Sequence, residues 1–222
     1  MSLERIKGFD KIGRGVDKLW VYNDLLHQEL AHDYLQKVNF SIQDISYLLG
    51  ESNRIEKRAD VVSLIVMVDW IADAVWRYKH CLAKGLLDAF KYSQQNELTR
   101  SHAFIKAVRS IVVAHPLSTD QHKDLGLDGD LICVDLRTSQ PFAFASRDSV
   151  RRFGINGIEP YDNKHDDDVY LYVYSKEANA QYFEFLVVDL ADVIRVARVY
   201  IDQLCEIDKH LCKLRKKDYA DK

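Results

Sequence analysis

The chain has 222 residues, of which 47% are hydrophobic and 29% are charged, a balance typical of a soluble globular protein. Its formal net charge of -3 argues against a dedicated high-affinity nucleic-acid binder, because such proteins depend on clustered positive charge. That charge still permits an enzyme that contacts RNA briefly through a local basic pocket.

The first residues, MSLERIKGFDK, contain no apolar core of a signal peptide. The longest apolar run, VVSLIVMV, is too short to cross a bilayer. No CxxC pair is present, which favours reduced thiols; the cysteines are Cys81, Cys133, Cys205 and Cys212. We therefore expect a cytoplasmic protein with no membrane contact.

Helical spacing of apolar residues predicts helices in the first half of the chain. The first runs from Val16 to about Asn39, and a shorter one opens at Ser41, a candidate N-cap, and ends at Gly50. A long helical segment follows from about Asn53 to Gln94, with a bend or a break at Lys84-Gly85. Its centre, VVSLIVMVDWIADAVWRY, is apolar nearly all round and is therefore expected to be buried on most sides.

Another helix is predicted before residue 115. Thr99 or Ser101 serves as its cap, and apolar residues recur on one side from Ala103 to Val112. Pro116 disfavours helical geometry at the residue before it, so the helix is expected to stop near Ala114.

Strand patterns then replace helical ones. The segments DLICVDLRTS, QPFAFAS, DVYLYVYS and QYFEFLVV predict strands, and the acidic stretch YDNKHDDD predicts a turn between two of them. Helical spacing returns at Asp189 and continues to the basic end KLRKKD. We expect one mainly α domain over residues 1–222, an up-and-down helical bundle with a small antiparallel β-rich insertion at residues 125–188 before the last helix.

Two stretches look like metal motifs but have the wrong spacing. HQELAH places His27 and His32 five residues apart, whereas two histidines that share a zinc on one helix face lie four apart. YDNKHDDD lacks the spacing and the glycine of a calcium loop. We interpret the first as surface helix residues and the second as a solvated hairpin turn, and we expect neither a metal nor another cofactor.

The stretch KAVRSIVVAHPLST, residues 106–119, carries the strongest candidate chemistry. Arg109 and His115 are separated by five residues, and Pro116 frees His115 from helical geometry, so that its side chain can turn back towards Arg109. A histidine that titrates near neutrality can move a proton. An arginine can hold a phosphate that gains charge in a transition state.

In this motif and in the order of its elements the chain resembles the HEPN superfamily of α-helical bundle proteins. The signature of that superfamily is an arginine, four to six further residues and a histidine, at the end of the penultimate core helix. RSIVVAH, from Arg109 to His115, matches it. The resemblance covers the helical parts of the chain, and the β-rich insertion is not a general feature of the superfamily.

The resemblance implies a function. Many HEPN proteins are metal-independent endoribonucleases of toxin–antitoxin, phage-defence or RNA-processing systems, and they act as dimers whose two motifs face one cleft. Carried over, His115 is the acid and base while a ribose 2′-OH attacks the adjacent phosphate, and Arg109 stabilises the phosphorane. The implied partners are a second copy of the chain, an RNA substrate and an antitoxin or other protein.

Three further residues are expected to support the motif. Ser110 follows the arginine, where catalytic members often carry Asn, Asp or His. Asp69 and Asp73 interrupt the most apolar helix, and a buried carboxylate requires a partner. For Asp73 that partner can be Arg77, four residues on, whereas Asp69 is the better candidate to orient Arg109 or His115.

Two other hypotheses compete with the nuclease. The net charge and Ser110 are compatible with a non-catalytic HEPN-like module that binds a protein or a small ligand, through the insertion for example. A helical scaffold, with Arg109 in a salt bridge and His115 capping a helix end, is the simplest alternative.

Overall fold

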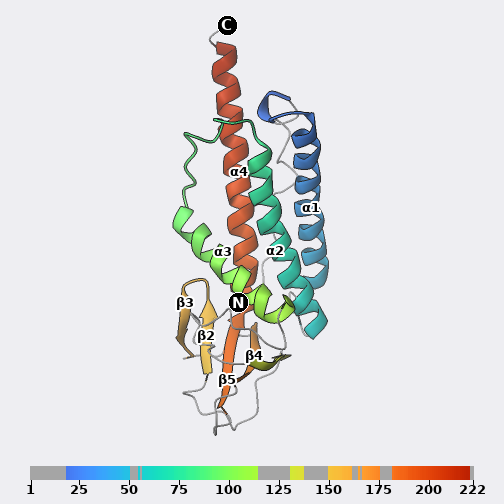
Figure 1. The fold of residues 1–222 in the computed structure, drawn as a ribbon, viewed down its shortest axis with the longest axis vertical. Helices are drawn as coiled ribbons and strands as arrows, with labels where there is room; N and C mark the ends of the chain where they lie inside the picture. Colours follow the sequence, from blue (N-terminus) through green and yellow to red (C-terminus); the bar gives the residue numbers. More distant parts are fainter. Residues whose placement is uncertain are drawn as a thin grey trace.

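The computed structural model describes residues 19–50, 55, 57–114, 131–137, 150–161, 165, 167–175 and 182–220. Within these ranges the protein is mainly helical, with four α-helices and one five-stranded sheet. Helices α1, α2 and α4 run side by side, α3 crosses them obliquely, and the sheet lies at one end of the bundle (Figure 1). At the opposite end α4 continues beyond α1 and α2 (Figure 1).

Helix α1 spans Leu25–Leu49 as one continuous helix. It begins at Asp24, whose side chain accepts a hydrogen bond from the His27 N–H at 2.9 Å, and it ends at Gly50, whose φ of 52° favours glycine. The predicted start at residue 16 and the predicted break at Ser41 are wrong. Ser41 is buried inside an apolar stripe that keeps its helical spacing on both sides, so packing overrides the capping signal.

Helix α2 spans Arg58–Cys81 and is buried on most sides, as its apolar centre predicted. It ends at Cys81, shortly before Lys84-Gly85, where a bend or a break was predicted. The chain leaves the helix at Leu82 in an extended conformation, and backbone hydrogen bonds then join residues 81–83 to residues 21–23, including Ala83 N to Val21 O at 2.8 Å. These bonds to a distant segment end the helix, and nothing local in the sequence announces them.

Helix α3 spans Gln95–Arg109 and is followed by a π-helical turn, Ser110–Ala114. The start lies several residues before the predicted caps, Thr99 and Ser101. Ser101 is instead buried, and Thr99 donates its hydroxyl to the Gln95 carbonyl within the first turn. The end near Ala114 was predicted correctly, but regular α geometry stops at Arg109, so the hydrogen-bonding pattern changes directly after the candidate catalytic arginine.

The sheet consists of β1 (Leu131–Arg137), β2 (Val150–Gly154), β3 (Gly157–Pro160), β4 (Asp168–Ser175) and β5 (Tyr182–Asp189), in the order β1-β4-β5-β2-β3. The predictions for β1, β4 and β5 are confirmed. The strand predicted at QPFAFAS lies outside the described residues, and β2 and β3 were not predicted.

The sheet is mixed, which corrects the expected antiparallel insertion. Strands β1, β4 and β5 pair antiparallel, and so do β2 and β3, but β2 runs parallel to β5. The difference arises because β4 pairs with β1 and β5 and not with β3, which precedes it in the chain. The β2–β3 hairpin therefore pairs with the edge of β5 that β4 leaves free. No tight turn connects β2 to β5, so the direction of β2 relative to β5 is not set by a local turn.

Helix α4, Leu190–Ala220, starts directly after β5 and supplies the stripe that closes the core. Val193, Val196, Leu204 and Ile207 of this stripe are buried together with residues of α1, α2 and α3. The expected long closing helix is confirmed. No helix in the described ranges combines the length and the apolar character needed to span a bilayer.

Candidate functional site

The candidate catalytic arginine is the last residue of α3. The side chain of Arg109 is 47% exposed, although α3 packs against α2 and α4. Ser110 opens the π-helical turn, and its N–H donates to the carbonyls of Lys106 and Ala107. His115, the other candidate catalytic residue, lies outside the described residues. The arrangement around Arg109 is therefore built from helices α2, α3 and α4.

Asp69 and Asp73 are joined by one lysine from α3. The Lys106 Nζ lies 2.8 Å from an oxygen of Asp69 and 2.8 Å from an oxygen of Asp73. The side chain of Asp69 is only 7% exposed, so it requires a charged or hydrogen-bonding partner. Partial burial lowers the pKa of Lys106, but the hydrogen bonds and charges of both aspartates outweigh it, and its pKa is raised.

The second oxygen of Asp69 faces Arg109, with 3.6 Å between Asp69 Oδ2 and Arg109 Nε. Asp69 thus divides its two oxygens between Lys106 and Arg109. Among the described residues, Asp69 is the ion-pair partner of Arg109. The contact uses Nε of the guanidinium, which carries five N–H donors in all. No other described residue forms an ion pair with the terminal nitrogens. We refer to Asp69, Asp73, Lys106 and Arg109 as the charged cluster.

The alternative pairing of Asp73 with Arg77 is not observed. Asp73 contacts Lys106 from the neighbouring helix, and among the residues that the structure describes it has no ion pair with Arg77. The acidic residues of α2 therefore point towards α3 and not along their own helix. The cluster holds two negative and two positive side chains, and all of them except Asp69 are partly exposed.

A histidine and a tyrosine extend the cluster towards α4. His102 Nδ1 lies 2.8 Å from the hydroxyl of Tyr200. Partial burial, and then the positive charge of Lys106, lower the pKa of His102, and Asp73 and Asp69 oppose this shift only in part. The lowered pKa favours the neutral ring of His102, which can accept a proton or a hydrogen bond from its surroundings.

Sequence reasoning missed Lys106, His102 and Tyr200. A signal for the first two was present, because His102, Lys106 and Arg109 are spaced four and three residues apart and so lie on one face of a helix. Asp69 and Asp73 are likewise four apart. Two polar stripes of opposite charge on two helices indicate that those helices pack against each other through them.

A separate polar network lies in the sheet. Arg152 of β2 forms a two-pronged ion pair with Asp168 of β4, at 2.7 and 3.1 Å, and the Asp168 side chain is 1% exposed. The Tyr161 hydroxyl and the His165 N–H also donate to Asp168, at 3.1 and 2.8 Å. Asp168 is therefore a fully bonded interior residue, and the interpretation of this residue as part of a solvated turn is wrong.

The same region contains three potential metal ligands. One ligand atom each of His165, Asp168 and Asp189 lie within 4.8 Å of one another. The Nδ1 of His165 already bonds Asp189 at 2.7 Å, and Arg152 supplies the positive charge that Asp168 requires. These contacts describe a structural network that ties β2, β4 and β5 together, and we assign it no ion.

Comparisons with protein families, with curated proteins and with solved structures give no match to this chain.

Proposed function

We propose that the chain is an HEPN-like, metal-independent endoribonuclease, of an up-and-down bundle fold, in which Arg109 and His115 act on a phosphodiester. The observation that carries the proposal is the setting of Arg109. Its Nε faces the buried carboxylate of Asp69, and its side chain is half exposed at the end of α3. A guanidinium held from one side and open on the other is suited to binding a phosphate.

Each residue of the cluster has a role in this proposal. Asp69 orients Arg109 by holding Nε, so that the terminal nitrogens point to the phosphate oxygens. Lys106, anchored by two aspartates, adds positive charge beside the arginine. His115 takes the proton of the attacking ribose 2′-OH and returns one to the leaving 5′ oxygen. The products are a 2′,3′-cyclic phosphate end and a 5′-OH end.

The proposal includes a homodimer in which two copies of Arg109 and His115 face one cleft. An RNA strand is the proposed substrate, and an antitoxin-like protein is a proposed partner. In such a cleft the two copies of Arg109 would bring two guanidinium groups to one RNA strand.

A non-catalytic ligand-binding or protein-binding module is the second candidate. One observation favours it. Two carboxylates, Asp69 and Asp73, face the two cations of the cluster, so the cluster is close to neutral before any ligand binds. A neutral cluster attracts a polyanion less than an unbalanced one does. Under this hypothesis the purified protein binds a partner but does not cleave RNA.

The test is RNA cleavage by the purified protein in excess EDTA. Wild type is expected to cleave, and Arg109→Ala and His115→Ala are expected to lose activity while circular dichroism shows a folded protein at the assay temperature. Arg77→Ala is the matched control, since Arg77 is exposed on α2 and outside the cluster. If RNA cleavage survives in Arg109→Ala and in His115→Ala, the nuclease proposal is refuted. If wild type does not cleave RNA, the non-catalytic module is favoured.

A further inference from the structure

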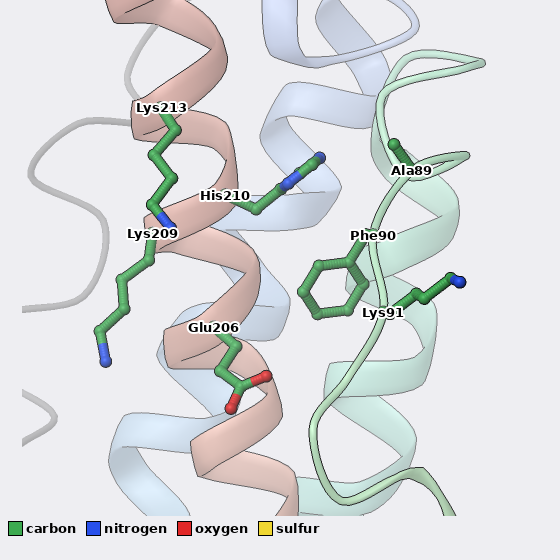
Figure 2. Close-up of a pocket in the computed structure, with 7 residues that line it drawn as sticks. All are labelled: Ala89, Phe90, Lys91, Glu206, Lys209, His210 and Lys213. Atoms are coloured by element: carbon green, nitrogen blue, oxygen red, sulfur yellow. The ribbon is translucent and has the colours of Figure 1, made fainter.

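A pocket lies between α4 and the segment that joins α2 to α3. Its volume is about 330 Å³, and its lining includes Phe90, Lys91, Glu206, Lys209, His210 and Lys213. Figure 2 shows the Phe90 ring directed towards α4, with Lys209 and Lys213 along α4 and Lys91 extending away on the far side of Phe90. His210 lies ten residues after Tyr200 on α4, roughly 15 Å along the helix, so the pocket is distinct from the charged cluster.

The wall opposite α4 is fixed in place by hydrogen bonds. Ser93 donates its N–H and its hydroxyl to the two oxygens of Glu206, at 3.2 and 2.6 Å. The Nε2 of His210 lies 2.9 Å from the carbonyl of Leu86, and the buried hydroxyl of Tyr92 donates to a backbone carbonyl of α4 at 3.0 Å. The segment that joins α2 to α3 has turns but no regular helix or strand around Phe90. These hydrogen bonds attach it to α4 both before Phe90, at Leu86, and after it, at Tyr92 and Ser93. The pocket is therefore preformed, as small-molecule sites usually are.

The lining of the pocket carries three lysines and one glutamate, so its net charge is positive. Lys209 and Lys213 are four residues apart on one face of α4, where like charges repel each other. Among the described residues, neither they nor Lys91 has a carboxylate within 4.0 Å. Both oxygens of Glu206 are already bonded to Ser93. A bound anion is the group that would relieve the repulsion between these lysines.

The remaining lining identifies the rest of the ligand. Phe90 and His210 have ring centroids 5.5 Å apart at a tilt of 58°, and Phe90 is only partly buried. An aromatic surface of this kind can contact a planar base, while flexible lysines hold a phosphate as point charges. The volume lies at the low end of the range for small-molecule pockets, which suits one nucleotide and not a longer strand.

We propose that this pocket binds a mononucleotide, with Lys209 and Lys213 at the phosphate and Phe90 against the base. The proposal does not depend on ribonuclease activity, because none of its residues belongs to the charged cluster or to the Arg109–His115 motif.

The experiment is isothermal titration of the full chain with adenosine monophosphate, with inorganic phosphate and with adenosine, at constant ionic strength. Adenosine monophosphate is expected to bind saturably and more tightly than either of its parts. The double variant Lys209→Gln/Lys213→Gln is expected to bind it about tenfold more weakly or worse, because two charge-assisted contacts are lost. These lysines are exposed, so thermal unfolding should confirm an intact fold.

Two control variants accompany the titration. Lys57→Gln removes an exposed lysine that makes no side-chain cap hydrogen bond at the start of α2, and it should bind like wild type. Arg109→Ala should also bind like wild type, which separates this site from the proposed nuclease site. The proposal is overturned if adenosine monophosphate shows no saturable binding at millimolar concentration, or if the lysine double variant binds as tightly as wild type. Equal affinity for inorganic phosphate and adenosine monophosphate overturns the nucleotide assignment.

Discussion

Asp69 Oδ2 lies 3.6 Å from Arg109 Nε, and this contact joins the most apolar helix of the bundle to the residue that ends α3. The other oxygen of Asp69 is bonded to Lys106 at 2.8 Å, so one buried carboxylate positions two cations. A buried aspartate in this position has a structural cost unless both cations stay in place. The energetics of the cluster and its proposed chemistry therefore depend on the same side chain.

Asp69→Asn should weaken both the fold and the cleavage of RNA. The amide keeps the shape of the carboxylate but not its charge, so the free energy of unfolding should fall by about 1–3 kcal/mol. With Arg109 no longer held, the cleavage rate should fall on the order of 10- to 100-fold. Urea unfolding and the EDTA cleavage assay measure the two effects.

Asp73→Asn is the matched comparison for that variant. Asp73 is half exposed and pairs with Lys106 but not with Arg109, so both losses should be smaller, with a change in stability of about 0.5 kcal/mol. Equal effects of the two substitutions would show that the contact between Asp69 and Arg109 has no specific role.

His102 should make stability depend on pH. The pKa of His102 is lowered from its ordinary value of 6.5, chiefly by partial burial. As the pH falls through about 6.5 the unfolded chain binds the proton first, so the free energy of unfolding decreases until the folded-state pKa is reached and then levels off. Urea unfolding across this window should show that slope in wild type and a reduced slope in His102→Gln.

His32→Gln serves as the control for this experiment, since His32 is exposed on α1 and should leave the slope unchanged. An NMR titration of the His102 ring gives the pKa directly. A midpoint at or above 6.5 contradicts the assigned environment, in which partial burial, and then the charge of Lys106, lower the pKa of the ring.

Gly154→Ala should destabilise the contact between the β2–β3 hairpin and α4. A Cβ at this position would lie 2.6 Å from an oxygen of Asp192, whose carboxylate also accepts the Ile155 N–H at 3.3 Å. Either the hairpin or Asp192 must shift, at a cost of about 1–3 kcal/mol in unfolding free energy. The cost should be smaller in an Asp192→Ala background, and a double-mutant cycle in urea that shows strict additivity refutes the clash.

Arg152→Met should strongly destabilise the sheet. The substitution leaves the interior carboxylate of Asp168 without its cation, and removing one partner of a buried ion pair costs about 3–5 kcal/mol. Arg100→Met, which removes only an exposed hydrogen bond to Asn156, should cost about 0.5 kcal/mol at most. Unfolding curves of the two variants that coincide would show that the Arg152–Asp168 pair is not a structural requirement.

The sequence predicted the helices and strands that carry a clear apolar period, but not how they terminate or pair. The stripe of α4 and the alternation of β4 are local patterns, and both elements form as expected. The end of α2 at Cys81 depends on hydrogen bonds to residues 21–23, and the parallel pairing of β2 with β5 depends on which edge stays free. Such long-range contacts produce no periodic pattern in the sequence, so they could not be predicted from it.

Part of the candidate site could be predicted, because a buried carboxylate requires a charged or hydrogen-bonding partner. The position of Asp69 in an apolar run indicated a partner, and Arg109 lies beside it. Lys106 and His102 were missed because lysine and histidine on a helix face are usually solvated, and their spacing indicates a shared face but not the partners that they contact on α2 and α4. The catalytic roles of Arg109 and His115 stay predictions.

The ends of the RNA products test the central claim most directly. Purified protein is incubated with a labelled single-stranded RNA in excess EDTA, and the new termini are identified by mass spectrometry. The proposed use of Arg109 and His115 predicts 2′,3′-cyclic phosphate and 5′-OH ends, which disappear with Arg109→Ala. Absence of cleavage, 3′-OH and 5′-phosphate ends, or unchanged products from Arg109→Ala would each contradict it.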